Sequence, residues 1–259
     1  SAVTQTYMRL QTILGAQGEL NAPLDSTLAQ DFDATAVRPS DYHTEVALGL
    51  RQGATTWNKF GYNDDIDVGT EVVASWGGTF QYLTSGETIN IVSSSANDDL
   101  TGTGAQRLVI TGIDENWEGQ VEIIEMDGTS NVVTTSQWIG VNRISMFKAG
   151  SGAVNDGAIT VTAVTSGYTM GQMPAGEGVS QQFIFYVPLG HVYLGEWLFF
   201  NALKLSGGGG APELIFKIKV YSDINTGVQQ VFKAKMDVAN SNTLEPSNPL
   251  PFAIGEKSI

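Results

Sequence analysis

The sequence predicts an all-β protein built from antiparallel strands in a sandwich-like or jelly-roll-like arrangement. Two runs, residues 107–113 and 120–126, alternate apolar and polar side chains with a period of two, which is the pattern of half-buried antiparallel strands. Glycine makes up 30 of the 259 residues, while only 15% of residues are charged. This balance is typical of short strands joined by tight turns, and of large surfaces that bury against neighbours.

Composition also narrows the classes of partner. The formal net charge is −14, so the chain repels phosphate backbones and anionic membrane surfaces. The chain has no cysteine, which removes disulfides, thiol nucleophiles and thiolate metal ligands. We therefore expect no nucleic-acid partner, no membrane partner and no cofactor.

Residues 1–56 are predicted to form an extended N-terminal arm. Tyr7, Leu10, Ile13 and Leu14 have helical spacing over one short segment, and the stretch that follows has few periodic features. Long segments without regular structure are uncommon inside compact domains. The arm either packs on a neighbouring subunit or wraps irregularly around its own domain.

Residues 57–170 are predicted to form a first β-sandwich module. Gly77 and Gly78 are placed in a turn where both take positive φ. Residues 137–148 also fit a helical stripe, but strand is favoured because the neighbouring segments are strands rich in β-branched residues. The expected strands are residues 57–62, 71–76, 79–83, 88–93, 107–113, 120–126, 131–136, 137–148 and 157–164.

Residues 171–259 are predicted to form a second β-sandwich module, or else to continue one domain that spans 57–259. Residues 166–178, rich in Gly, Met and Pro, are interpreted as the link between the modules. Lys217 and Lys219 alternate with apolar residues and are placed on the solvated face of a sheet. The expected strands are residues 180–187, 191–198, 213–221 and 228–236, with one more after the final prolines.

An acidic loop early in the first module is the best candidate metal site. Alternating side-chain oxygens are the ligands that Ca²⁺ prefers. The candidate ligands are Asn63, Asp65, Asp67 and Glu71. An EF-hand loop would have Gly where Val68 stands and Glu where Ala74 stands, so an Asx-rich turn before a strand is the alternative. Asp98 and Asp99 would add ligands only if the fold brings them close.

The connector between the runs 107–113 and 120–126 is the candidate binding tip. It carries one aromatic residue, Trp117, among the polar residues Asp114, Glu115 and Glu118. Strand tryptophans usually belong to the core, whereas Trp117 lies on a polar loop. The sequence therefore predicts an exposed tip with Trp117 as its contact residue.

No catalytic motif is recognisable, so we expect a protein that is not an enzyme. The only histidines, His43 and His191, are far apart in sequence, and no nucleophile elbow or phosphate-binding loop is found. Glycosidases use two carboxyl groups at a defined distance from each other, and the sequence alone does not show which carboxyl groups lie at that distance.

Five segments of the sequence carry a resemblance to known proteins: KFGYNDDIDVGTEVVASWGGTFQYL, IVSSSANDDLTGTGAQRLVITGIDENWEGQVEIIEMDGT, AGSGAVNDGAITV, YVPLGHVYLGEWLF and PLPFAIGEKSI. Together they resemble a family of tailed-phage virion proteins that is common in marine and freshwater phages. The resemblance covers residues 60–259, and its motifs are turns and strands. In that family a strand continues past Ile259, which implies a final strand that is missing or supplied by another subunit.

The resemblance implies a virion structural protein, and the composition fits such a role. The first expectation is a capsid decoration or cement protein on the outer capsid surface, assembled in the host cytoplasm as a homo-oligomer, a trimer among the options. Its partners would be the major capsid protein or tail proteins. The alternatives are a tail, fibre or neck component, or a carbohydrate- or receptor-binding β-sandwich.

Overall fold

The computed structural model describes residues 42–66, 69–195, 200–202, 213–222, 227–237, 243–244 and 252–259. The chain divides into two units, Ser1–Asn58 and Lys59–Ile259. The described residues are nearly all β, in several antiparallel sheets, and this confirms the predicted fold class. The jelly-roll topology and the division at residue 170 stay predictions.

In the first unit, the described residues contain the short helix α3 (Tyr42–Ala47). Gly49, two residues after its end, has a φ of 70°. Gly49 N donates to Val46 O and Leu50 N donates to Glu45 O, which is the Schellman arrangement that satisfies terminal carbonyls. The Arg51 guanidinium pairs with Glu45 at 2.6 Å. The predicted helical stripe that begins at Tyr7 lies outside the described residues.

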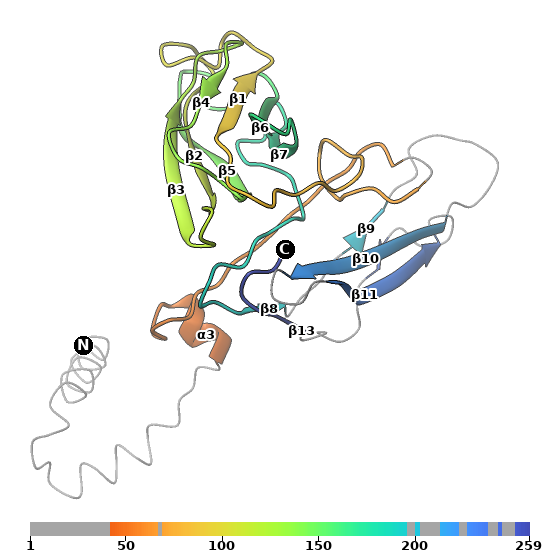
Figure 1. Cartoon of the computed structure of the whole chain (residues 1–259). Helices are drawn as coiled ribbons and strands as arrows, with labels where there is room; N and C mark the ends of the chain where they lie inside the picture. Colours follow the sequence, from red (N-terminus) through yellow and green to blue (C-terminus); the bar gives the residue numbers. More distant parts are fainter. Residues whose placement is uncertain are drawn as a thin grey trace, which may run out of the picture. The chain divides into compact units, whose positions relative to one another are not determined.

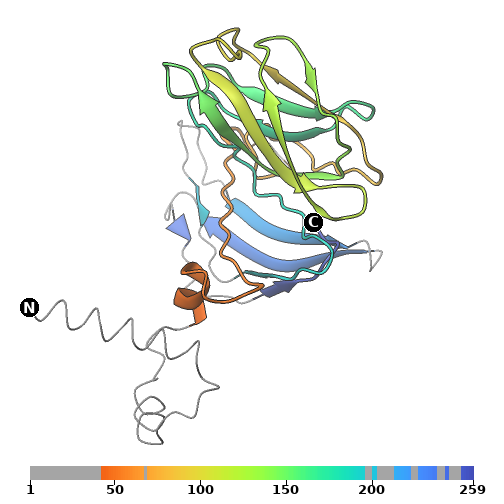
Figure 2. The same ribbon diagram turned by 90° about the vertical axis from the view of Figure 1, so that its left-hand side faces the viewer.

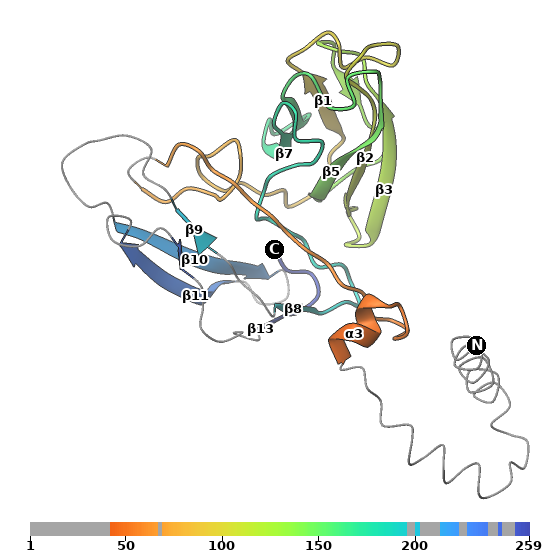
Figure 3. The same ribbon diagram turned by 180° about the vertical axis from the view of Figure 1, so that it is seen from behind.

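In the second unit, two antiparallel sheets form a sandwich-like region (Figures 1 and 3). Figure 3 shows β1 and β7 on one side of this region and β2, β3 and β5 on the other. The first sheet has the order β4-β1-β6-β7 and the second the order β3-β2-β5. Their bounds are β1 (Ile89–Ser93), β2 (Ala105–Ile113), β3 (Gly119–Glu125), β4 (Val132–Val133), β5 (Gly140–Ala149), β6 (Ile159–Ala163) and β7 (Thr169–Met173).

Each sheet turns one apolar face into a shared hydrophobic cluster. The predicted strands 107–113 and 120–126 are confirmed, and they pair with each other: Arg107 lies opposite Glu125 and Ile113 opposite Gly119. Trp138 is fully buried in the cluster. The fully buried strand residues of the cluster include Ile89, Ile91, Ile159 and Val161 of the first sheet and Leu108, Ile110, Val141 and Ile144 of the second. Each such side chain contributes about 1.5–3 kcal/mol to folding.

The strand predicted at residues 137–148 is confirmed in its main part as β5, which begins at Gly140 and is no helix. It pairs along its length with β2. The predicted link 166–178 is wrong in part, since it contains β7. Gly167, with a φ of 72°, makes the turn between β6 and β7, and Met170 and Met173 enter the core.

Residues 57–62, 71–76 and 79–83 form no strand, which corrects three predictions. Backbone groups of residues 71–76 bond to a distant segment: Ser75 N donates to Gln181 O at 2.9 Å, and Phe183 N donates to Val73 O at 2.7 Å. Gly77 and Gly78 have φ values of 61° and 73°, so the prediction of a turn with two positive φ angles is confirmed.

Residues 180–187 also form no regular strand, although they lie along the edge of β5. Side chains replace the ladder there, because Asn142 both donates to Tyr186 O at 3.0 Å and accepts from Tyr186 N at 2.6 Å. The Ser180 hydroxyl accepts from Ile144 N at 3.0 Å. The buried Gln182 donates to Val141 O at 2.9 Å. Polar side chains therefore cover the edge that a strand would have covered.

The C-terminal strands pair in three two-stranded sheets among the described residues: β10 with β11, β9 with β12, and β8 with β13. Figure 2 shows the long hairpin of β10 and β11. Val220 of β10 packs with Phe185, Val187 and Ile254 in a small cluster. The bounds are β8 (Tyr193–Gly195), β9 (Phe200–Asn201), β10 (Glu213–Ser222), β11 (Gly227–Asp237), β12 (Thr243–Leu244) and β13 (Phe252–Ile254).

Candidate functional site

The predicted binding tip is a tight loop, residues 114–118, that joins β2 to β3. The Asp114 carboxylate accepts from Asn116 N at 2.8 Å and from Glu118 N at 2.9 Å. Asp114 N donates to Glu118 O at 3.0 Å. Asp114 therefore organises the loop from within, while Glu115 and Glu118 are exposed.

The structure corrects the prediction that Trp117 is an exposed contact residue. Only 9% of its surface is accessible. Its ring lies 6.4 Å from that of Tyr186 and packs with Ile113 and Ile139, and its carbonyl accepts from Leu189 N at 2.8 Å. Trp117 thus anchors the loop. Its φ of 65° turns the side chain inward, a conformation that sequence patterning does not reveal for a tryptophan.

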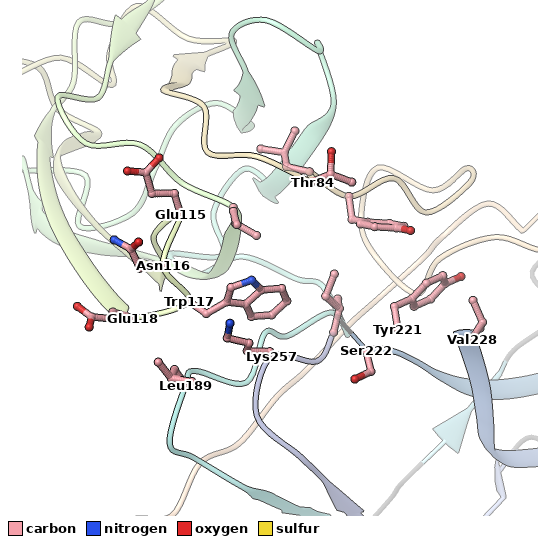
Figure 4. Close-up of a pocket in the computed structure, with 14 residues that line it drawn as sticks. Thr84, Glu115, Asn116, Trp117, Glu118, Leu189, Tyr221, Ser222, Val228 and Lys257 are labelled. Carbon is pink, nitrogen blue, oxygen red and sulfur yellow. The ribbon is translucent and has the colours of Figure 1, made fainter. Parts of the chain in front are cut away.

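A cleft of about 910 Å³ lies beside this loop (Figure 4). Trp117 lies in the middle of the close-up, and Lys257 is drawn beside it. Glu115 and Glu118 belong to the lining, and Tyr221 contributes an aromatic ring on another side. The sequence did not connect these residues, because they come from segments more than 100 residues apart.

The aromatic part of the lining belongs to a small stack of rings. Tyr82 lies 5.4 Å from Tyr221, and Phe80 lies 5.3 Å from Tyr221, measured between ring centroids. Such tilted pairs are favourable geometries for aromatic rings. With carboxylates on the loop and phenols on the other wall, the cleft can hold a polar ligand with hydrogen-bonding groups and an apolar face.

The calcium loop is an Asx-type turn in the described residues. The Asn63 side-chain oxygen accepts from Asp65 N at 3.1 Å, and the Asn63 amide donates to the Glu71 carboxylate at 3.0 Å. Glu71 also accepts from Gly78 N at 3.4 Å. Asp67 lies outside the described residues. In the part of the chain that the structure describes, no cluster of three or more His, Asp or Glu could hold a metal ion.

Asp98, considered as an additional calcium ligand, is a buried structural group. One carboxylate oxygen accepts from Ala105 N at 2.7 Å and Asp156 N at 2.8 Å. The other accepts from the Ser93 hydroxyl at 2.6 Å and Gly157 N at 2.9 Å. Four donors converge on this carboxylate, so its lone pairs already accept hydrogen bonds. They are therefore not free to coordinate a cation.

The neighbouring carboxylates are held in the same way. The Thr101 backbone N–H and hydroxyl lower the pKa of Asp99. The Ser95 hydroxyl and the Asn97 amide lower the pKa of Asp156. These acids tie loops together at one end of the sandwich-like region.

The outer face of the second sheet is a surface that the sequence did not single out. We use "outer face" for the side chains of Val109, Thr111, Val121, Ile123 and Ser145. Val121 is 65% exposed and Ile123 is 51% exposed. Both lie on β3, which pairs only with β2 among the described strands. Val109 lies between Ile123 and Ser145 across the three strands, so the apolar side chains are contiguous.

The two histidines belong to different units of the chain. His191 is exposed, and its Nδ1 lies 2.9 Å from Leu189 O. His43 belongs to α3 in the other unit.

Comparison of the chain with family models, with curated proteins and with solved structures found no match. Among the described residues, no helix has both the length and the apolar character needed to span a membrane.

Proposed function

We propose that this protein is a non-enzymatic structural protein of a tailed-phage virion, and that it decorates and stabilises the outer capsid surface. The observation that carries an assembly role is the outer face, where Val121 and Ile123 are exposed side by side on an edge strand. The resemblance of residues 60–259 to phage virion proteins supports the choice of particle.

An exposed apolar strand such as β3 is stabilised when a partner covers it. Adjacent apolar side chains on a sheet face gain about 25 cal/mol per Å² when a partner covers them. An edge strand also offers unpaired backbone groups to a partner. Because β3 combines both properties, it suits permanent burial against another virion subunit.

Two further properties support a position on the exterior. The net charge of −14 disfavours contact with packaged nucleic acid. Repeated subunits on a shell form symmetric contacts, so we propose a homo-oligomer. Its partner on the particle is the major capsid protein.

The test measures the protein on purified particles. Decoration predicts a copy number that scales with the capsid lattice, and cryo-EM density on the outer shell. A handful of copies at the tail or neck supports the alternative of a tail component, and absence from particles overturns both. The double variant Val121→Glu/Ile123→Glu should lower particle occupancy at least 10-fold. The control Val164→Glu changes another exposed valine and should leave particle occupancy unchanged.

The cleft favours one second function, binding of a carbohydrate or a glycosylated receptor. Tyr82 and Tyr221 would supply stacking faces, and Glu115 and Glu118 would accept hydroxyl protons. Saturable binding on a glycan array that Tyr82→Ala abolishes, and that the control Phe147→Ala preserves, would support this function. A blank array together with no adsorption to host cells removes it.

A further inference from the structure

The hairpin of β10 and β11 presents a lysine face on a strongly acidic chain. We define the lysine face as Lys217, Lys219, Lys233 and Lys235, which are exposed on the two strands. They are four of the thirteen cationic residues of the chain. The long strands that carry them are visible in Figure 1.

The alternation along β10 points this face away from the interior. Ile218 and Val220 are buried, and Val220 packs against Phe185 and Ile254. Lys217 and Lys219 alternate with these residues, so they lie on the opposite side of the strand. The register shift between Ile218 and Lys219 leaves Val231 of β11 unpaired, so the extra residue lies on β11 and the alternation on β10 is uninterrupted.

The lysines repel one another across the hairpin. Lys217 lies directly opposite Lys233, and like charges in directly opposed positions destabilise a sheet. Lys217, Lys219 and Lys233 make no ion pair with any described residue. Their arrangement therefore favours a partner that brings negative charge.

The same chain carries a suitable acidic surface on the loop 114–118. Glu115 and Glu118 are exposed, and neither carboxylate makes a hydrogen bond or ion pair within the described residues. The loop is pre-organised before it binds a partner, because the Asp114 carboxylate accepts hydrogen bonds from two of its backbone N–H groups. Trp117 also anchors it in a buried cluster. A pre-organised loop loses little conformational entropy when it binds.

The side chains around the lysine face favour a protein partner over a nucleic-acid partner. Ile215 and Val231 are exposed on the hairpin as well, so apolar side chains accompany the charges, as at protein interfaces. The net charge of −14 repels a polyanion such as nucleic acid. The acidic residues that cause this charge also give every other copy of the chain a surface that is complementary to the lysine face.

We propose that the lysine face binds the acidic loop 114–118 of a second copy of this chain. This inference deepens the proposed assembly function and rests on it. The two surfaces are different, so the contact is head-to-tail. Contacts of this kind close into rings when the rotation between copies closes, and otherwise extend into filaments.

A charge-swap experiment on the full chain tests the contact. Self-association is measured by sedimentation velocity at low and high salt. The variants Lys217→Glu/Lys233→Glu and Glu115→Lys/Glu118→Lys should each weaken association at least 10-fold, and high salt should weaken the wild type in the same direction. The quadruple variant should restore association to within about 3-fold, because the charges are exchanged across the contact.

Two controls separate this contact from a folding defect and from a general charge effect. Lys148→Glu changes an exposed lysine on β5 and should leave association unchanged. Lys217→Gln/Lys233→Gln removes the charges without reversing them and should give an intermediate loss. None of the variants should lower the Tm below that of the wild type.

The proposal is overturned if the wild type is monomeric at every concentration tested, or if the quadruple variant stays dissociated. It is also overturned if the lysine variants lose binding to DNA while self-association is unchanged, which would assign the face to nucleic acid. Particle occupancy is measured separately with the Val121 and Ile123 variants, so failure of the virion role and failure of this contact are distinguishable.

Discussion

The sandwich-like region and the C-terminal strands are stabilised in different ways. Strands β1 to β7 share one cluster of fully buried Ile, Val and Leu side chains around Trp138. Strands β8, β10 and β13 contribute Tyr193, Val220 and Ile254 to a smaller cluster. In the described residues the larger cluster therefore lies in the first region, and the hairpin of β10 and β11 exposes charged and apolar side chains.

The largest expected effect comes from Trp138. Trp138→Ala leaves a cavity inside the shared cluster and should lower the free energy of unfolding by about 3–5 kcal/mol. Trp138→Phe should cost less, because the buried indole Nε1 has no hydrogen-bond partner to lose. Chemical denaturation measures both. Equal losses for the two variants would contradict the role of the cavity.

Asp98→Asn comes next in size. It places an amide among four donors that now converge on a carboxylate, so we expect a loss of about 2–4 kcal/mol. The matched control is Asp127→Asn, which changes an exposed carboxylate and should stay within about 0.5 kcal/mol. If thermal unfolding shows similar losses for both, the buried network does not hold the loops.

Trp117 tests the junction between the two regions. Trp117→Ala should lower stability by about 2–3 kcal/mol and speed amide exchange in β10 and β11 more than in β2 and β5, because Tyr186 and Ile259 pack around the ring. Trp117→Gly should be less damaging than Trp117→Ala by about 1 kcal/mol, since glycine accepts the φ of 65°. Faster exchange confined to β2 and β5 would contradict the anchoring role.

The smallest effect is a pH dependence from Lys59. Burial, and then the charge of Arg143, lower the pKa of Lys59 to about 7, and its ammonium donates to Asn142 O. Between this pKa and the unfolded value of about 10.4, only the unfolded chain binds the proton, so the free energy of unfolding should rise as the pH rises.

The variant Lys59→Met should remove that slope and raise stability at pH 7 by about 1–2 kcal/mol, an amount reduced by solvent around the half-buried side chain. Denaturation midpoints at several pH values between 7 and 10 measure it. A slope that survives in the variant would assign the pH dependence to another group.

The sequence by itself determined the fold class and the regular strands. Period-two alternation in residues 107–113 and 120–126 predicts the β2–β3 hairpin, because the core face of a half-buried strand shows directly in its side chains. The same signal places the lysines of β10 on an exposed face. Gly77 and Gly78 show the turn that they form, since two adjacent residues with positive φ require glycine.

Tertiary structure decided the features that depend on distant partners. Residues 180–187 look like a strand, but the Asn142 side chain, about 40 residues away, occupies both backbone hydrogen-bonding groups of Tyr186. Trp117 lies in a polar loop, yet its backbone angle and the approach of Tyr186 bury it. The cleft and the outer face likewise need strands paired across the fold, because sequence patterning reports local periodicity and carries no record of which segments meet.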